Sequence, residues 1–253
     1  FFFGPGADKI SFDEASLRPL RVWPSPQDNI ATRPATDDWP FLYLNYAAGG
    51  IWLYLSVLVV AVLLPALVLT KNKSGPISGS AWANMFFLGQ AFMLVETKSI
   101  TQLSLLFGAT WIVTSIVTLV VLTLAVIANW VASKRQSTIV LPLYICVLLA
   151  LALDYIFSIP PDTNVHFVLL AVVASLISCL PILFGGLIFS TCFRKATSPA
   201  LYLSANLLGV AVGGLSENLC LFTGIKGLVP IAMLLYVLSY LALRVPGGKS
   251  EAA

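Results

Sequence analysis

The sequence predicts an all-α integral membrane protein, a polytopic bundle of about seven transmembrane helices preceded by an irregular extramembrane arm. First, 58% of the 253 residues are hydrophobic and only 10% are charged, whereas soluble domains are about 45–50% apolar and about 25% charged. Second, the apolar residues form successive runs of the roughly 20 residues that a bilayer crossing requires. This composition excludes a soluble domain and a disordered chain. The formal net charge is only +3 and the basic residues form no patch, which argues against a nucleic-acid partner.

The first element is an N-terminal arm, residues 1–46. It holds most of the acidic residues and six prolines, Pro5, Pro19, Pro24, Pro26, Pro34 and Pro40. Proline removes a backbone donor and disfavours helix just before itself, so an irregular extramembrane segment is expected. Asp37 and Asp38 could form a catalytic carboxylate pair. Followed by Trp39 and Pro40, they equally indicate a turn or a helix-entry cap.

Residues 47–245 are expected to form the transmembrane bundle, and residues 246–253 a short tail. The expected spans are Ala47–Thr70, Trp82–Phe107, Thr110–Ala132, Thr138–Ile159, Val165–Cys192, Ala200–Thr223 and Gly227–Leu243. Polar, proline-containing or glycine-containing breaks separate them. The break Gly224–Lys226 is so short that the last two spans should form an antiparallel hairpin.

Lys and Arg in the short loops predict the orientation, because cytoplasmic loops carry an excess of them. One side of the membrane receives Lys71, Lys73, Lys134, Arg135, Arg194, Lys195, Arg244 and Lys249, whereas the short loops of the other side carry only Lys226. The C-terminus is therefore expected in the cytoplasm. With seven spans, the N-terminal arm is expected outside.

The most unusual segment is Glu96–Ser104, a mostly polar run inside an apolar span. A charge that faces lipid costs at least about 2.5–3.5 kcal/mol on insertion scales, and intramembrane charges usually face the bundle interior or a wet cavity. We therefore expect this helix to be central or to line a cavity, either as a packing clamp or as part of a ligand or ion pathway. Our hypothesis is that Lys98 pairs with Glu217 or Asp154.

Other polar residues of the spans fall in the same, outer half of the membrane. The candidate intramembrane cluster is Glu96, Lys98, Gln102, Asp154, His166, Glu217 and Asn218. His166 lies at a loop end, where an imidazole is more often solvated than functional. A single cluster of this kind does not make a proton relay, which needs titratable groups across the whole membrane.

Small residues indicate close helix packing. Gly209 and Gly213 form a GxxxG pattern, which lets helix backbones approach closely. We expect them to serve packing within the bundle more than dimerisation. Gly185 and Gly186 are expected to do the same, or to act as a hinge after Pro181.

No catalytic, cofactor or metal site is expected from the sequence. The chain has one histidine, which disfavours His-based metal sites, hydrolytic triads and bis-His haem ligation, and it has no GxGxxG motif or P-loop. The four cysteines are Cys146, Cys179, Cys192 and Cys220. They are widely spaced in apolar runs, which favours buried hydrophobic roles over disulfides.

Three stretches, in this order, resemble the membrane part of bacterial membrane-bound spermidine-synthase-like proteins. They are T-D-D-W-P-F at 36–41, F-L-G-Q-A-F-M-L-V-E at 87–96 followed by Q-L-S-L at 102–105, and A-N-L-L-G at 205–209 followed by G-G at 213–214 and E-N-L at 217–219. The resemblance implies a C-terminal membrane module in a bacterial cytoplasmic (inner) membrane, with the arm as the tail of a soluble domain. In that family a Rossmann-like domain precedes the module, and its nucleotide-binding glycines and catalytic acids are absent here.

The first functional expectation is therefore a non-catalytic anchoring or accessory subunit that docks other membrane or extracytoplasmic protein subunits. The polar cluster and the arm would form its docking face. The second is a transporter of a small polar or cationic solute, with Glu96, Asp154 and Glu217 as binding carboxylates. The third is the membrane module of an enzyme whose Rossmann-like domain precedes residue 1.

Overall fold

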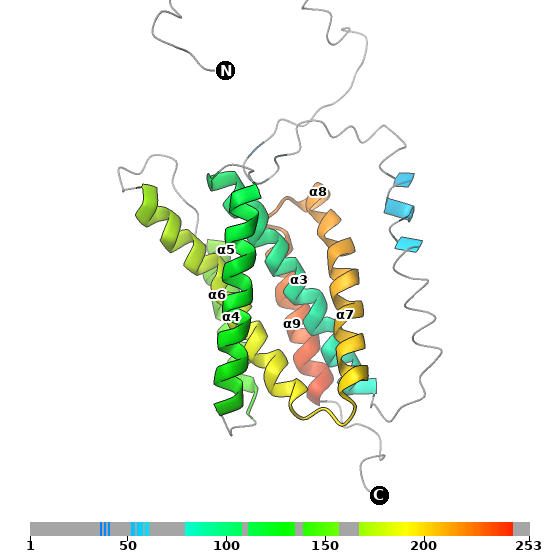
Figure 1. The fold of residues 1–253 in the computed structure, drawn as a ribbon. Helices are drawn as coiled ribbons and strands as arrows, with labels where there is room; N and C mark the ends of the chain where they lie inside the picture. The colour runs from blue at the N-terminus through cyan, green and yellow to red at the C-terminus, as the bar shows by residue number, and fades with distance from the viewer. Residues whose placement is uncertain are drawn as a thin grey trace, which may run out of the picture.

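The computed structural model describes Thr36, Asp38, Pro40, helical residues within 52–60, and residues 79–107, 111–134, 139–156 and 167–244. The helices are α3 (Gly79–Phe107), α4 (Trp111–Lys134), α5 (Leu141–Ile156), α6 (Phe167–Phe193), α7 (Pro199–Ser216), η3 (Glu217–Leu219), α8 (Cys220–Thr223) and α9 (Leu228–Arg244). Figure 1 shows the long helices side by side, with α3, α5 and α7 running in one direction and α4, α6 and α9 in the other.

The described residues confirm the all-α class, and each expected span from Trp82 onward overlaps a helix. Among the described residues, three helices are long and apolar enough to cross a membrane, over Val117–Lys134, Ser175–Phe193 and Pro199–Thr223, while α5 and α9 are shorter apolar helices. The expected span Ala47–Thr70 is described only within 52–60. Most of the arm and the tail 246–253 lie outside the described residues.

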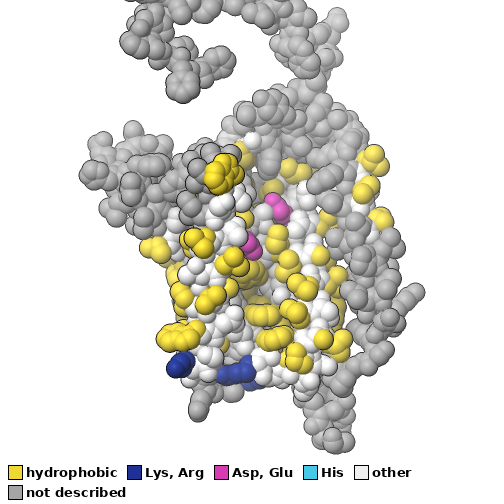
Figure 2. Space-filling model, in the orientation of Figure 1, with side chains coloured by type: hydrophobic (Ala, Val, Ile, Leu, Met, Phe, Trp, Pro, Cys, Tyr) yellow, Lys and Arg dark blue, Asp and Glu magenta, His cyan; other side chains and the backbone are white. Residues whose placement is uncertain are grey.

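The polar helix α3 is central, as its sequence predicted. It packs against α7, α9, α6 and α4. Its polar side chains Asn84, Lys98 and Ser99 are buried, which explains how an apolar bundle accommodates them. By contrast, Leu119, Val126 and other large apolar residues of α4 are exposed. Figure 2 shows hydrophobic side chains over the described part of one face and Lys and Arg side chains at its lower end.

The GxxxG pattern of α7 packs against α3 inside the bundle. A Cβ atom at Gly209 would overlap the backbone oxygen of Phe86, and one at Gly213 would lie 2.8 Å from the backbone oxygen of Gln90. Residue numbers at these contacts increase in the same direction along α3 and α7, so the two helices run parallel. The expectation of packing within the bundle is confirmed by these contacts.

The glycine pair of α6 also packs between helices. Gly185 faces the hydroxyl group of Tyr236 on α9, and a Cβ atom at Gly186 would lie 3.1 Å from the Cβ atom of Ala128 on α4. Helix α6 continues through Pro181 from Phe167 to Phe193. The two glycines therefore lie within a continuous helix and contribute close packing.

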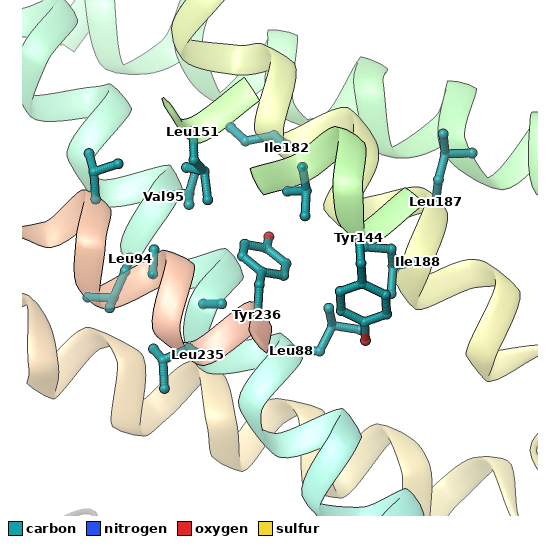
Figure 3. Packing of buried hydrophobic residues seen from close by; sticks show 14 of the residues in the cluster. Leu88, Leu94, Val95, Tyr144, Leu151, Ile182, Leu187, Ile188, Leu235 and Tyr236 are labelled. Carbon is teal, nitrogen blue, oxygen red and sulfur yellow. The ribbon is translucent and has the colours of Figure 1, made fainter. Parts of the chain in front are cut away.

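The bundle interior is a cluster of aliphatic and aromatic side chains from α3, α5, α6 and α9. Figure 3 shows Tyr236 among Val95, Leu151 and Ile182. Tyr144 lies beside Ile188 in the same view. In a membrane such close packing, together with interhelical hydrogen bonds, holds helices together because lipid is as apolar as the core. Two sets of polar side chains lie within this apolar cluster, and they form the candidate site.

Candidate functional site

The main polar feature of the interior is an ion pair between Lys98 on α3 and Asp154 on α5. The two side chains are 5% and 3% exposed. The hydroxyl group of Ser178 on α6 donates a hydrogen bond to Oδ1 of Asp154 at 3.1 Å. The pairing of Lys98 with Asp154, one of its two expected partners, is thus confirmed. The pair ties three helices together and compensates a charge that would otherwise be buried alone.

Further hydrogen bonds surround the ion pair. The single hydroxyl hydrogen of Ser99 is shared between two acceptors, the backbone oxygens of Val95 at 2.8 Å and Ser178 at 3.0 Å. Oε1 of Gln102 lies 3.5 Å from the Ser178 hydroxyl oxygen and is the more distant of two acceptors for the same hydrogen. The contact with Ser178 joins the central helix α3 to α6 beside the ion pair.

The space beside the ion pair is a narrow gap between α3, α5 and α9. Its lining residues are Leu94, Val95, Lys98, Leu151, Asp154, Leu228, Val229 and Ala232, and it has no room for a water molecule. The electrostatic attraction of a charge pair is stronger in such a dry environment than in water. The Lys98–Asp154 pair is therefore a closed internal clamp, which holds α3 and α5 together and has no room for water beside it.

The other members of the expected cluster are arranged differently. Glu96 on α3 and Glu217 in η3 are partly buried, and neither carboxylate has a hydrogen-bond or ion-pair partner among the described residues. Asn218 donates to the backbone oxygen of Leu215 at 3.0 Å, within its own helical segment. His166 lies outside the described residues. The structure therefore brings together Lys98, Gln102 and Asp154.

The burial of the ion pair changes one expectation about docking. Lys98 and Asp154 are 4% and 5% exposed as whole residues. They offer no surface to a partner protein in this conformation. A docking face would have to consist of other residues at this end of the bundle.

A second polar network was not expected from the sequence. Nδ2 of Asn84 on α3 donates to the hydroxyl oxygens of Tyr144 at 3.0 Å and Ser239 at 2.8 Å. The two hydroxyl groups are 2.8 Å apart, and Ser239 donates to the backbone oxygen of Asn84 at 3.1 Å. All three residues are buried. The network joins α3, α5 and α9, and an asparagine inside the apolar span Trp82–Phe107 was its only signal in the sequence.

The hydroxyl group of Tyr236 is buried and, within the described part of the chain, has no hydrogen-bond partner. Tyr236 lies one turn before Ser239 on α9, and its hydroxyl group faces Gly185. A buried polar group without a partner is rare and costs free energy. The hydroxyl group is therefore a local weakness of an otherwise well-paired interior.

The arm contributes one well-placed residue, Asp38. Its backbone oxygen accepts a hydrogen bond from the N–H group of Ile225 at 2.8 Å, and its Oδ1 atom accepts one from the N–H group of Lys226 at 2.7 Å. Asp38 thus caps the turn that enters α9. This agrees with the capping interpretation of the Asp37–Asp38 pair, although the turn is distant in sequence and Asp37 lies outside the described residues.

No protein-family model, curated protein or solved structure matches the chain. Within the described ranges, no group of three or more His, Cys, Asp or Glu side chains is placed to hold a metal ion. The cysteines Cys146, Cys179, Cys192 and Cys220 are free thiols. The described residues define the class of the protein: an all-helical bundle of membrane type, built around a polar central helix and a buried ion pair.

Proposed function

We propose that the chain is a membrane-embedded anchoring or accessory module, related to the membrane part of the spermidine-synthase-like proteins, that docks a partner protein. The main support is the closed Lys98–Asp154 clamp. A solute carrier needs a binding group that water and solute can reach. Asp154 already has Lys98 as its counter-ion, and the adjacent gap has no room for water.

The contact of Asp38 with the bundle gives further support. It places part of the N-terminal arm against the turn at Ile225 and Lys226. An arm fixed at one end of a bundle is a suitable base for docking a soluble or membrane partner. We propose that this end, with the exposed Leu219 of η3, carries the docking face.

The distribution of basic residues supports an orientation for the module. Lys134, Arg194, Lys195 and Arg244 lie where α4, α6 and α9 end. Figure 2 shows Lys and Arg side chains at the lower end of its face. The rule that cytoplasmic loops are rich in Lys and Arg would place this end in the cytoplasm. We propose a bacterial cytoplasmic membrane with the Asp38 end outside.

The test is cross-linking in the native membrane, followed by purification of the full chain in a gentle detergent. A photo-reactive amino acid replaces Leu219, exposed near the arm contact, or Leu241, exposed near the opposite end of α9. The expected result is a stoichiometric protein partner that cross-links from position 219 and not from position 241. A chain that purifies alone, or that cross-links equally from both positions, contradicts the proposal.

A second candidate, a carrier of a small cationic solute, is favoured by the carboxylates of Glu96 and Glu217, which have no hydrogen-bond or ion-pair partner among the described residues. The experiment is uptake of a radiolabelled polyamine by proteoliposomes that contain the full chain. A carrier would show saturable uptake that Glu96→Gln abolishes while the protein stays folded. The anchoring proposal expects no such uptake by the parent protein.

A further inference from the structure

The turn between α8 and α9 is closed by a residue from far away in the chain. Gly224 has a positive φ of 82°, a conformation that glycine adopts readily and other residues rarely do. A Cβ atom at this position would lie 2.5 Å from Oδ2 and 3.0 Å from the backbone oxygen of Asp38. Asp38 is therefore seated directly against the turn, where only glycine leaves room for it.

The same turn leads into the wall of the gap beside the ion pair. The N–H groups of Leu228 and Val229 donate to the backbone oxygens of Ile225 and Lys226, both at 3.1 Å. The N–H groups of the same two residues, Ile225 and Lys226, donate hydrogen bonds to Asp38. Leu228 and Val229 are each 3% exposed and line the gap. A continuous series of hydrogen bonds thus connects Asp38 to the residues that cover the ion pair.

We propose that the turn and the first residues of α9 form a lid over the Lys98–Asp154 pair, and that Asp38 is its latch. With Asp38 in place, the N–H groups of Ile225 and Lys226 are satisfied and the gap is dry. Removal of the Asp38 carboxylate takes away the acceptor of the Lys226 N–H group, and a charged acceptor makes stronger hydrogen bonds than a neutral oxygen. The start of α9 then opens more often, and water reaches the ion pair. This role is independent of the proposed docking.

Cys179 is a built-in reporter for such opening. It follows Ser178 on α6, is 3% exposed, and lies close enough to Asp154 and Lys98 to interact with them electrostatically. The reporter protein is the full chain with Cys146, Cys192 and Cys220 replaced by Ala. The measured quantity is the rate at which a small methanethiosulfonate reagent labels Cys179 in detergent micelles.

The parent reporter is expected to label slowly. Asp38→Ala should accelerate labelling about tenfold or more, because it removes one hydrogen bond to a charged group, worth about 1.5–3 kcal/mol, and leaves the backbone oxygen of position 38 in place. Gly224→Ala should accelerate labelling at least as much, because its added Cβ atom would displace both the carboxylate group and the backbone oxygen of Asp38. Asp38→Asn keeps an oxygen acceptor, but a neutral one, and should label at a rate between those of the parent and of Asp38→Ala. Gly214→Ala is the matched glycine control, because its added Cβ atom makes only an ordinary contact of 3.8 Å with Met93.

Three results would overturn the latch. One is a parent rate as high as that of Asp38→Ala. Another is an unchanged rate in both Asp38→Ala and Gly224→Ala. The third uses a second reporter that keeps only Cys192, which is 7% exposed and lies at the C-terminal end of the same helix, whereas Cys179 lies near its middle. Equal acceleration at Cys192 would show general loosening of the bundle in place of a local lid.

Discussion

Lys98 on α3 and Asp154 on α5, 56 positions apart in the sequence, form an ion pair in the interior of the bundle. Ser178 on α6 adds a hydrogen bond to the same carboxylate. The pair therefore fixes the relative positions of three helices at one level. Removal of one partner from a buried pair leaves an uncompensated charge, whereas apolar replacement of both can be neutral or stabilising.

Lys98→Met and Asp154→Leu are each expected to lower the free energy of unfolding by about 3–5 kcal/mol. The double variant should regain most of this loss, because no buried charge remains. The measurement is a double-mutant cycle by unfolding in mixed micelles of a mild detergent and sodium dodecyl sulfate. Losses that simply add in the double variant would contradict a direct pairing.

Charge is the reason that the sequence predicted this contact. A charged residue within an apolar span needs a partner of opposite charge inside the bundle. Few acidic residues lie within the spans, so Asp154 and Glu217 were the expected ion-pair partners of Lys98. The helices from residue 79 onward were likewise predictable, because apolar runs and their breaks bound them. Both arguments rest on the cost of polar groups in lipid.

The same reasoning could not find the network of Asn84, Tyr144 and Ser239. Neutral Ser and Tyr residues are common in membrane helices and carry little insertion cost, so nothing marks the members that meet. Their contact depends on how α3, α5 and α9 pack, which helical periodicity alone does not give. The contact of Asp38 with Lys226 was missed for the same reason, since 188 positions separate the two residues.

Gly209→Ala is expected to destabilise the bundle by about 1–3 kcal/mol, as overpacking of a close contact does. The added Cβ atom would overlap the backbone oxygen of Phe86 and force α3 and α7 apart. The readout is the melting temperature in detergent, with the oligomeric state measured alongside. Gly214→Ala serves as the control. A change of oligomeric state without loss of stability would indicate a dimer contact instead.

The orientation predicts which ends of the bundle a membrane-impermeant maleimide can reach on intact cells. Lys226 and Lys195 are both exposed and lie at opposite ends of the bundle. In a background without native cysteines, Lys226→Cys should be labelled on intact cells. Lys195→Cys should be labelled only after the membrane is permeabilised. The reverse pattern would place the C-terminus outside.

Two buried tyrosines give a matched comparison of the same atomic change. Tyr236→Phe removes a hydroxyl group that has no partner among the described residues, so the free energy of unfolding should stay unchanged or rise by about 1 kcal/mol. Tyr144→Phe removes a hydroxyl group that is hydrogen-bonded to Asn84 and Ser239. The free energy of unfolding should therefore fall by about 0.6–2 kcal/mol. Both variants lose one oxygen atom from a buried ring, so the difference between them isolates the hydrogen bonds. Equal destabilisation would mean that Tyr236 bonds to a buried water molecule or a ligand.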